Sequence, residues 1–193
     1  MSDTYISTAP KTNYGVKAST GTMGVLCRDN KVLIIRRRLK NRDTRQDGPP
    51  DTWAFPGGGL DEDETPEMCI VREMKEELGV DVAIKLVGDE SVWAVTDDDV
   101  NGTLWRCNFF IFCQTDPDQE PQIMEPHKHC GLQWIKWKAL WAEIKADIEG
   151  RGETNEAGQQ EKRFFPSMKN MVERYPGRGD PACLHNRLAS LVT

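Results

Sequence analysis

The segment from Gly57 to Gly79 limits the possible structures of this chain more than any other part of it. Three glycines at 57–59 form a turn, and Thr65, which can cap a helix, follows shortly after them. Pro66 suits the first turn of that helix, and Gly79 is the expected residue at its C-terminal end. One apolar face is formed by residues at helical spacing, namely Ile70, Val71, Met74 and Leu78. The pattern predicts one helix between a glycine turn and a glycine stop.

A second face of the same helix carries three glutamates, Glu73, Glu76 and Glu77, at spacing i, i+3 and i+4. Like charges at this spacing destabilise a helix unless solvent or a bound cation compensates them. Taken alone, a solvated acidic face is the more common explanation. The glycine turn before the helix, together with Glu64 and Arg72, favours a cation site instead.

These residues fall into one spaced motif. Gly58 is followed after five residues by Glu64, and after seven more by the run Arg72-Glu73-Met74-Lys75-Glu76-Glu77-Leu78-Gly79-Val80. This order matches every fixed position of the Nudix box, Gly-x5-Glu-x7-Arg-Glu-U-x-Glu-Glu-x-Gly-U, where U is an aliphatic residue. The chain therefore resembles a Nudix hydrolase, with the box at residues 58–80 and looser similarity over residues 16–175.

The resemblance implies a fold, a reaction and a cofactor. The implied fold is of the α/β class, the Nudix α/β/α sandwich with a mixed β-sheet. The implied reaction is the hydrolysis of a nucleoside diphosphate linked to another group, with Mg2+ or Mn2+ as cofactor. Such an ion prefers several oxygen ligands, which a carboxylate cluster supplies. It also lowers the pKa of a bound water, which prepares the water to attack phosphorus.

The resemblance also implies roles for single residues. The metal ligands would be Glu73, Glu76 and Glu77, one of which acts as base, together with the backbone carbonyl of Gly57. Glu64 and Arg72 would form an ion pair that orients Glu73, a supporting role in the catalytic site.

A later loop carries a further candidate. The segment Glu125-Pro126-His127-Lys128-His129-Cys130 and the cysteine at position 69 resemble the MutT-like, nucleotide-sanitising branch of the family. Many Nudix enzymes place in this loop a glutamate that completes the metal shell or serves as base, so Glu125 is a candidate ligand, with an ordinary loop carboxylate as the alternative. The two histidines and Cys130 are too close together to form a zinc site by themselves.

A basic stretch stands out in an otherwise acidic chain, and it consists of Arg36, Arg37, Arg38, Lys40, Arg42 and Arg45. On an extended strand Arg36 and Arg38 share one face and Arg37 points to the other. We therefore predict that Arg36 and Arg38 bind substrate phosphates, with a solvated loop as the more common alternative. Aromatic residues that could stack a nucleobase, although strand aromatics more often lie in the core, are Trp93, Trp105, Trp134 and Phe164.

The pattern of the rest of the chain predicts one domain. Residues 1–18 are expected to form a flexible arm, and residues 19–193 a Nudix domain with a C-terminal helical extension. Strands are predicted at 21–27, 31–35, 53–55, 80–86, 90–96, 103–114 and 132–135, and further helices at 137–148 and 165–175. The segment 36–50 is predicted to be a loop and 97–102 a turn.

Composition limits the partners. The formal net charge of -6 argues against stable binding to nucleic acid, which needs a basic face. No apolar run approaches a membrane span, no secretory signal is visible, and the six cysteines include no CxxC pair. We expect a cytoplasmic protein, with a nuclear address left open, whose partner is a phosphorylated small molecule, foremost a nucleotide.

The expected function is therefore that of a Nudix-type pyrophosphohydrolase, a hydrolase acting on acid anhydrides in nucleoside tri- or diphosphates. Hydrolysis of diphosphoinositol polyphosphates or dinucleoside polyphosphates is the alternative. A Nudix-fold binding module without catalysis is a third reading, which the complete set of box carboxylates disfavours.

Overall fold

The computed structural model describes residues 18–40, 47–83, 92–100, 103–152, 162–184 and 186. The predicted N-terminal arm lies outside the described residues, apart from Ala18, and so does the second half of the strand predicted at 80–86. Of that strand, Val82 forms an isolated bridge with Gln114. No helix in the described ranges has the length and apolar character to cross a bilayer.

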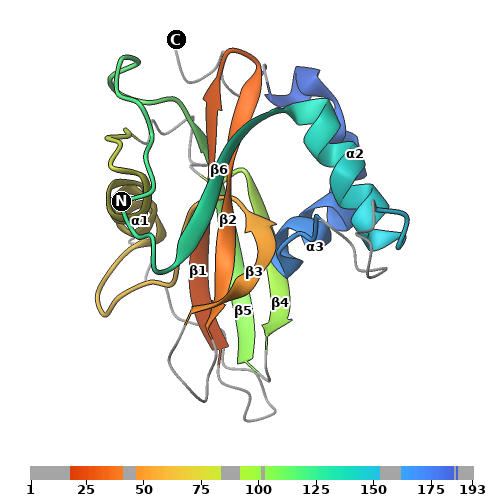
Figure 1. Ribbon diagram of the computed structural model, residues 1–193, viewed down its shortest axis with the longest axis horizontal. Coiled ribbons are helices and arrows are strands. Elements are labelled where there is room, and N and C mark those ends of the chain that lie inside the picture. The colour runs from red at the N-terminus through yellow and green to blue at the C-terminus, as the bar shows by residue number, and fades with distance from the viewer. Residues whose placement is uncertain are drawn as a thin grey trace, which may run out of the picture.

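Six strands form one mixed sheet (Figure 1). They are β1 (Ala18–Arg28), β2 (Lys31–Lys40), β3 (Asp47–Ala54), β4 (Ala94–Val100), β5 (Thr103–Phe112) and β6 (His129–Lys136). Their order is β3-β2-β1-β5-β4, and β6 pairs with β2. The neighbours β1 and β5 run parallel, whereas the other strand pairs are antiparallel.

Helices cover both faces of this sheet, as Figure 1 shows: α1 (Pro66–Leu78) lies on one side, and α2 (Trp137–Ile148) and α3 (Pro166–Arg174) lie on the other. A short 3-10 turn, Pro176–Gly179, follows α3. Strand β2 divides its side chains between the two layers, because successive strand residues point to opposite faces. Leu33 and Ile35 join the core under α1, and Val32 and Ile34 join the core under α2 and α3. The predicted α/β/α sandwich is confirmed.

The ends of α1 are those predicted. The Thr65 hydroxyl accepts a hydrogen bond from the Met68 N–H at 3.2 Å, and Gly79 ends the helix with φ 70°, a conformation that favours glycine. The predicted apolar face is wrong at Val71, which is exposed, whereas its neighbour Ile70 is buried. Val71 lies about 100° around the helix from Ile70, too far to reach the same core.

The predicted loop at 36–50 is wrong at both ends, because β2 continues to Lys40 and β3 already begins at Asp47. The prolines at 49 and 50 suggested a loop, since proline cannot donate a ladder hydrogen bond. They are tolerated here because β3 lies at the end of the strand order, and the pairing of β2 with β3 is irregular beside Arg38.

The predicted turn at 97–102 is also wrong, since β4 runs on to Val100. Three successive aspartates suggested a turn. Asp97 is instead placed opposite Arg106 on β5, and the Arg106 Nε donates to the Asp97 carboxylate at 3.0 Å. A cross-strand pair of opposite charges stabilises strand pairing where the residue types alone do not favour it.

The C-terminal extension is part of the sheet structure. Phe164 bridges Trp53 in parallel, through hydrogen bonds from the Trp53 N–H to the Arg163 carbonyl at 2.7 Å and from the Phe165 N–H to the Trp53 carbonyl at 2.9 Å. The buried carboxylate of Asp147 on α2 accepts from the Phe164 N–H at 2.8 Å. The same carboxylate lies 2.7 Å from the Lys169 ammonium on α3. One aspartate thus joins both helices to the edge of β3.

We therefore expect Asp147→Ala to lower the free energy of unfolding by about 1–3 kcal/mol, because the buried Phe164 N–H loses its acceptor. A thermal or urea unfolding curve checks this. Lys138→Ala, at an exposed position of the same helix, is the matched control and should change stability little. Equal stability of both variants would show that Asp147 does not anchor the extension.

Candidate functional site

The glycine turn approaches β1 more closely than any side chain would allow. Gly57 has φ 145°, and a Cβ placed on it would lie 2.1 Å from the carbonyl oxygen of Thr22. Two hydrogen bonds hold the turn on β1, from the Thr22 N–H to the Gly58 carbonyl and from the Gly24 N–H to the Pro56 carbonyl, both at 2.8 Å. The turn is therefore held against β1, next to α1.

The same turn fits the carboxylates of α1. The Gly57 N–H donates to Oε2 of Glu77 at 2.8 Å. A Cβ on Gly58 would lie 2.3 Å from Oε1 of Glu73, so any larger residue at this position would displace that side chain. Both glutamates are buried, at 8% exposure for Glu73 and 4% for Glu77. The glycines of the turn therefore determine where the carboxylates of Glu73 and Glu77 lie.

The thiol of Cys69 also packs against this turn. Its Sγ lies 3.3 Å from the Thr22 hydroxyl and 3.4 Å from the Gly59 carbonyl. Burial raises the pKa of the thiol to about 11, so the group is protonated at neutral pH. A protonated, buried thiol is a packing residue and not a nucleophile.

Arg72 is the centre of a network of acidic groups. Its guanidinium donates to both carboxylate oxygens of Glu64, at 2.8 and 2.9 Å, which is the predicted ion pair in bidentate form. Through Nη1 it also donates to Glu73 at 2.8 Å and to Glu76 at 3.0 Å. Hydrogen bonding to Arg72 lowers the pKa of Glu64 to about 2. Arg72 therefore links the start of the box to two of the three helix glutamates.

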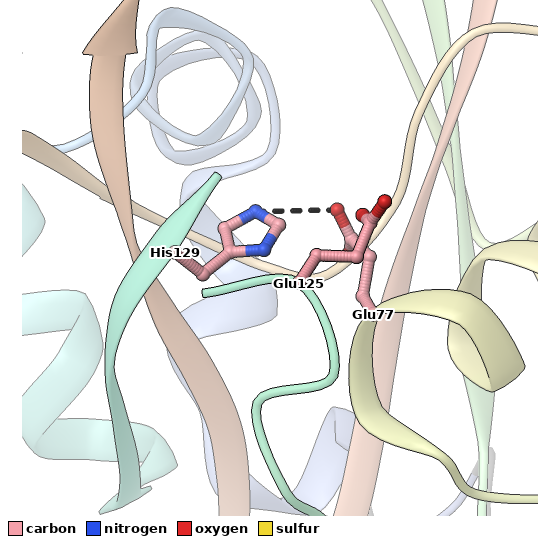
Figure 2. A group of neighbouring side chains, drawn as sticks. All are labelled: Glu77, Glu125 and His129. Carbon is pink, nitrogen blue, oxygen red and sulfur yellow. Dashed lines mark ion pairs between the residues drawn. The ribbon is translucent and has the colours of Figure 1, made fainter. Parts of the chain in front are cut away.

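A second cluster lies at the other end of the acidic face and consists of Glu77, Glu125 and His129 (Figure 2). Ligand atoms of these three residues all lie within 4.8 Å of one another. The Nε2 of His129 is 3.3 Å from Oε1 of Glu77, the contact drawn as a dashed line in Figure 2. It is the one group of three or more potential metal ligands of the His, Cys, Asp or Glu type found among the described residues.

The end of α1 places Glu125 in this cluster. The last carbonyls of a helix lack partners within it. Here the Glu77 carbonyl accepts from the Met124 N–H at 2.9 Å, and the Leu78 carbonyl accepts from the Gln122 N–H at 3.0 Å. The Glu125 carbonyl then accepts from the His129 N–H at 3.0 Å. The loop that satisfies the helix end therefore brings both Glu125 and His129 to Glu77.

The protonation of this cluster reflects its burial. Burial, together with the nearby charges of Glu73 and Glu125, raises the pKa of Glu77 to about 8, against the hydrogen bond from Gly57 and the charge of Arg37. Burial also lowers the pKa of His129 to about 4, helped by the nearby charge of Arg37. The imidazole is therefore neutral at neutral pH, and the carboxylate is held in a place that disfavours its negative charge.

These residues fit a divalent cation. Oε2 of Glu125 and Nδ1 of His129 are buried without a hydrogen-bond partner among the described residues, and such atoms are costly unless something binds them. The donors are two carboxylates and one imidazole, which are the usual ligands of divalent metals. A cation bound between these donors would compensate the buried negative charge of Glu77.

The predicted metal ligands are thus divided between two places. Glu77 and Glu125 lie together in the three-residue group. Glu73 and Glu76 are not part of it and accept hydrogen bonds from Arg72 instead. Glu76 is exposed and Glu73 is buried. His129 is a residue of the cluster that the sequence does not predict as a ligand, since His127, His129 and Cys130 are too close together to form a zinc site by themselves. Lys128, whose Nζ lies 2.7 Å from Glu125, was likewise missed.

Of the arginines at 36–38, the part of the basic stretch whose arginines the structure describes, Arg37 is the one that lies beside the cluster. Arg37 is the register partner of His129 on β6 and of Thr52 on β3, so these side chains share one face of the sheet. Its guanidinium lies over the ring of Phe165, 4.7 Å from the centroid. Alternation from Leu33 and Ile35 places Arg37 on the α1 face of β2, and its guanidinium extends to Phe165, which also packs against the core under α2 and α3.

The other two arginines are placed differently. Arg36 is paired with Gly131 and Trp53, and alternation along the strand puts it on the face opposite Arg37. Arg38 donates from Nε to the Pro126 carbonyl at 3.1 Å, a contact with the loop that carries Glu125. The pairing irregularity after Arg37 breaks the simple alternation on which the sequence prediction depended.

The four candidate aromatic residues separate by burial. Trp93 and Phe164 are buried in the core under α2 and α3. Trp134 is half-buried and carries the Arg28 guanidinium over its ring at 4.4 Å. Trp105 is half-buried beside the glycine turn, where a Cβ on Gly59 would lie 3.3 Å from its ring. Trp105 therefore remains a candidate for contact with a substrate.

We expect Arg72→Ala to destabilise the protein by about 1–2 kcal/mol near neutral pH, since Arg72 is partly exposed and solvent screens its ion pairs. The folded-state pKa of Glu64 is lowered from 4.5 to about 2, so its stabilisation is present above pH 4.5 and is lost as pH falls through about 2. The difference in Tm from the parent protein should therefore shrink between pH 7 and pH 3. Lys75→Ala, which removes an exposed ion pair with Asp81, should have a smaller effect at every pH.

Comparison with known proteins agrees with this geometry. The NUDIX domain family model matches residues 18–155. The chain is 43% identical over 60 residues to the 8-oxo-dGTP diphosphatase of Proteus vulgaris, which is 31% of this chain and 48% of that protein, so it spans about half the length of this relative. It is 30% identical over 123 residues to an RNA pyrophosphohydrolase of Rhodospirillum rubrum, which is 58% of this chain and 74% of the relative.

Solved structures show the same fold. The solution structure of the E. coli ORF135 protein has a TM-score of 0.56 and 19% identity, covering 86% of this chain and 93% of that one. The crystal structure of a MutT protein from Methanosarcina mazei Go1 has a TM-score of 0.55 and 13% identity, covering 86% of this chain and 98% of that one. With the family match over residues 18–155, the box on α1 and the shared sandwich, this chain belongs to the NUDIX domain family.

Proposed function

We propose that this protein hydrolyses a pyrophosphate bond in a nucleoside tri- or diphosphate, with Mg2+ or Mn2+ bound at the acidic end of α1. The observation that carries the proposal is the buried Glu77 carboxylate, fixed by the Gly57 N–H and facing Glu125 and His129. The names of two relatives, an 8-oxo-dGTP diphosphatase and an RNA pyrophosphohydrolase, denote cleavage of the same type of bond.

The residues divide into those that hold the metal and those that position them. Glu77 and Glu125 would hold it, joined by Glu73, Glu76 and the Gly57 carbonyl as the resemblance implies. When bound, such an ion polarises the phosphate, stabilises the leaving group and lowers the pKa of an attacking water. Arg72 and Glu64 keep Glu73 against the glycine turn, and a carboxylate of the cluster accepts the proton of the water.

The substrate class is open to one decisive experiment. A panel of nucleoside tri- and diphosphates, oxidised nucleotides, dinucleoside polyphosphates and a diphosphoinositol polyphosphate, scored by phosphate or pyrophosphate release, ranks the candidates. Turnover of none of them with Mg2+ or Mn2+ would favour a binding module, although buried box carboxylates are costly to keep in a protein that only binds.

The free cysteines among the described residues fit a reducing compartment such as the cytoplasm.

We expect EDTA to abolish hydrolysis and Mg2+ or Mn2+ to restore it. Glu77→Gln and Glu76→Gln should each lower kcat by about 100-fold or more while the protein stays folded, because a charged ligand is lost. Glu67→Gln, at the start of the same helix and away from the cluster, is the matched control and should keep near-normal turnover. Full activity in chelator, or in both the Glu76 and the Glu77 variant, would refute the metal-site assignment.

The role of Arg36 and Arg38 in phosphate binding stays a prediction. The register of β2 suggests that Arg37 is the arginine that binds a substrate phosphate. A guanidinium beside the acidic cluster can offer paired donors to a phosphate. We expect Arg37→Ala to raise KM about 10-fold or more, with a smaller effect for Arg36→Ala on the opposite face. The rise should shrink in high salt. An equal or larger rise in KM for Arg36→Ala would return the binding role to the pair predicted from sequence.

A further inference from the structure

His129 is the least expected member of the acidic cluster. Its side chain is almost fully buried, and it comes from β6, whereas Glu77 comes from α1. Figure 2 shows the imidazole and the two carboxylates turned toward one another. Its Nε2 faces the Glu77 carboxylate, and its Nδ1 has no hydrogen-bond partner among the described residues. The ring is therefore positioned for something beyond packing.

The distance between His129 and Glu77 separates two interpretations. At 3.3 Å, the contact from Nε2 to Oε1 is longer than the 2.7–3.2 Å of an ordinary N–H···O hydrogen bond. Two ligand atoms that share one ion, each at about 2.1 Å, lie about 3 Å apart when adjacent and about 4.2 Å apart when opposite. The three donors, all within 4.8 Å of one another, are close to that range.

Glu77 does not require the histidine for its orientation. Its Oε2 already accepts from the Gly57 N–H at 2.8 Å, in a turn that is held on β1 by two backbone hydrogen bonds. The Glu125 carboxylate is likewise held by Lys128 through one oxygen, which leaves Oε2 without a partner among the described residues. Each carboxylate thus has one oxygen fixed by the protein and the other available within the cluster.

We propose that His129 is itself a metal ligand, so that the site contains one nitrogen and at least two carboxylates and prefers Mn2+ to Mg2+. Imidazole suits transition metals, whereas Mg2+ is bound by oxygen ligands and retains its waters. The inference rests on the proposed metal site, but it concerns which ion the site selects and which atom of this chain binds it.

The test is a spectroscopic one on the whole chain with Mn2+ alone. Pulsed electron paramagnetic resonance of bound Mn2+ should show coupling to a directly bound imidazole 14N nucleus. The coupling should persist in His127→Gln, an exposed histidine two residues away, and should disappear in His129→Gln. Titration calorimetry should give at least a tenfold loss of Mn2+ affinity in His129→Gln, with a much smaller change for Mg2+.

The opposing results are equally definite. Absence of 14N coupling in the parent protein, or its persistence in His129→Gln, would overturn the inference, and the first of these needs no variant to fold. An equal loss of Mn2+ and Mg2+ affinity in a folded His129→Gln would assign the histidine a positioning role only. Because the readouts are binding and spectroscopy, nitrogen coupling without turnover of any substrate would uphold the ligand and defeat the proposed function. Turnover without nitrogen coupling would do the reverse.

Discussion

The hydrogen bond from the Gly57 N–H to the Glu77 carboxylate is the contact on which the site depends. It joins a turn that is fixed on β1 to the last turn of α1, and it buries a carboxylate that would otherwise stay in water. The end of that helix then recruits the loop that carries Glu125, through backbone hydrogen bonds to the Glu77 and Leu78 carbonyls. Strand, turn, helix and loop are positioned in this order, each by the one before it.

This arrangement sets stability against function. Burial raises the pKa of Glu77 and of Glu73, which means that folding works against their negative charge. The positive charge of Arg72 compensates part of the negative charge of Glu64, Glu73 and Glu76. Among the described residues, its ion pairs do not extend to the cluster of Glu77, Glu125 and His129. The acidic face is therefore compensated at one end by the protein and, in our proposal, at the other by a metal ion.

Sequence reasoning succeeded where the information is local. Thr65, Pro66 and Gly79 determine the ends of α1 by their own backbone preferences, and a nine-position motif fixed the family because its spacing reflects the glycine turn and the helix together. It failed where a distant partner decides. Asp97 lies in a strand because Arg106 faces it, and the prolines before Asp51 are tolerated because their strand is at an edge. His129 and Arg37 gained importance only through the pairing of β2 with β6, which a single sequence does not reveal.

The family match ends at residue 155, yet the chain returns at Phe164 to hydrogen-bond with β3. An open strand edge presents unpaired N–H and carbonyl groups that other chains can extend. By pairing with Trp53, the later segment protects part of that edge, and Asp147 holds it there from the helix behind. A variant cut back to the family boundary would leave this edge uncovered and invite intermolecular strand addition. The segment after the matched region therefore covers part of a sheet edge as well as adding side chains to the core.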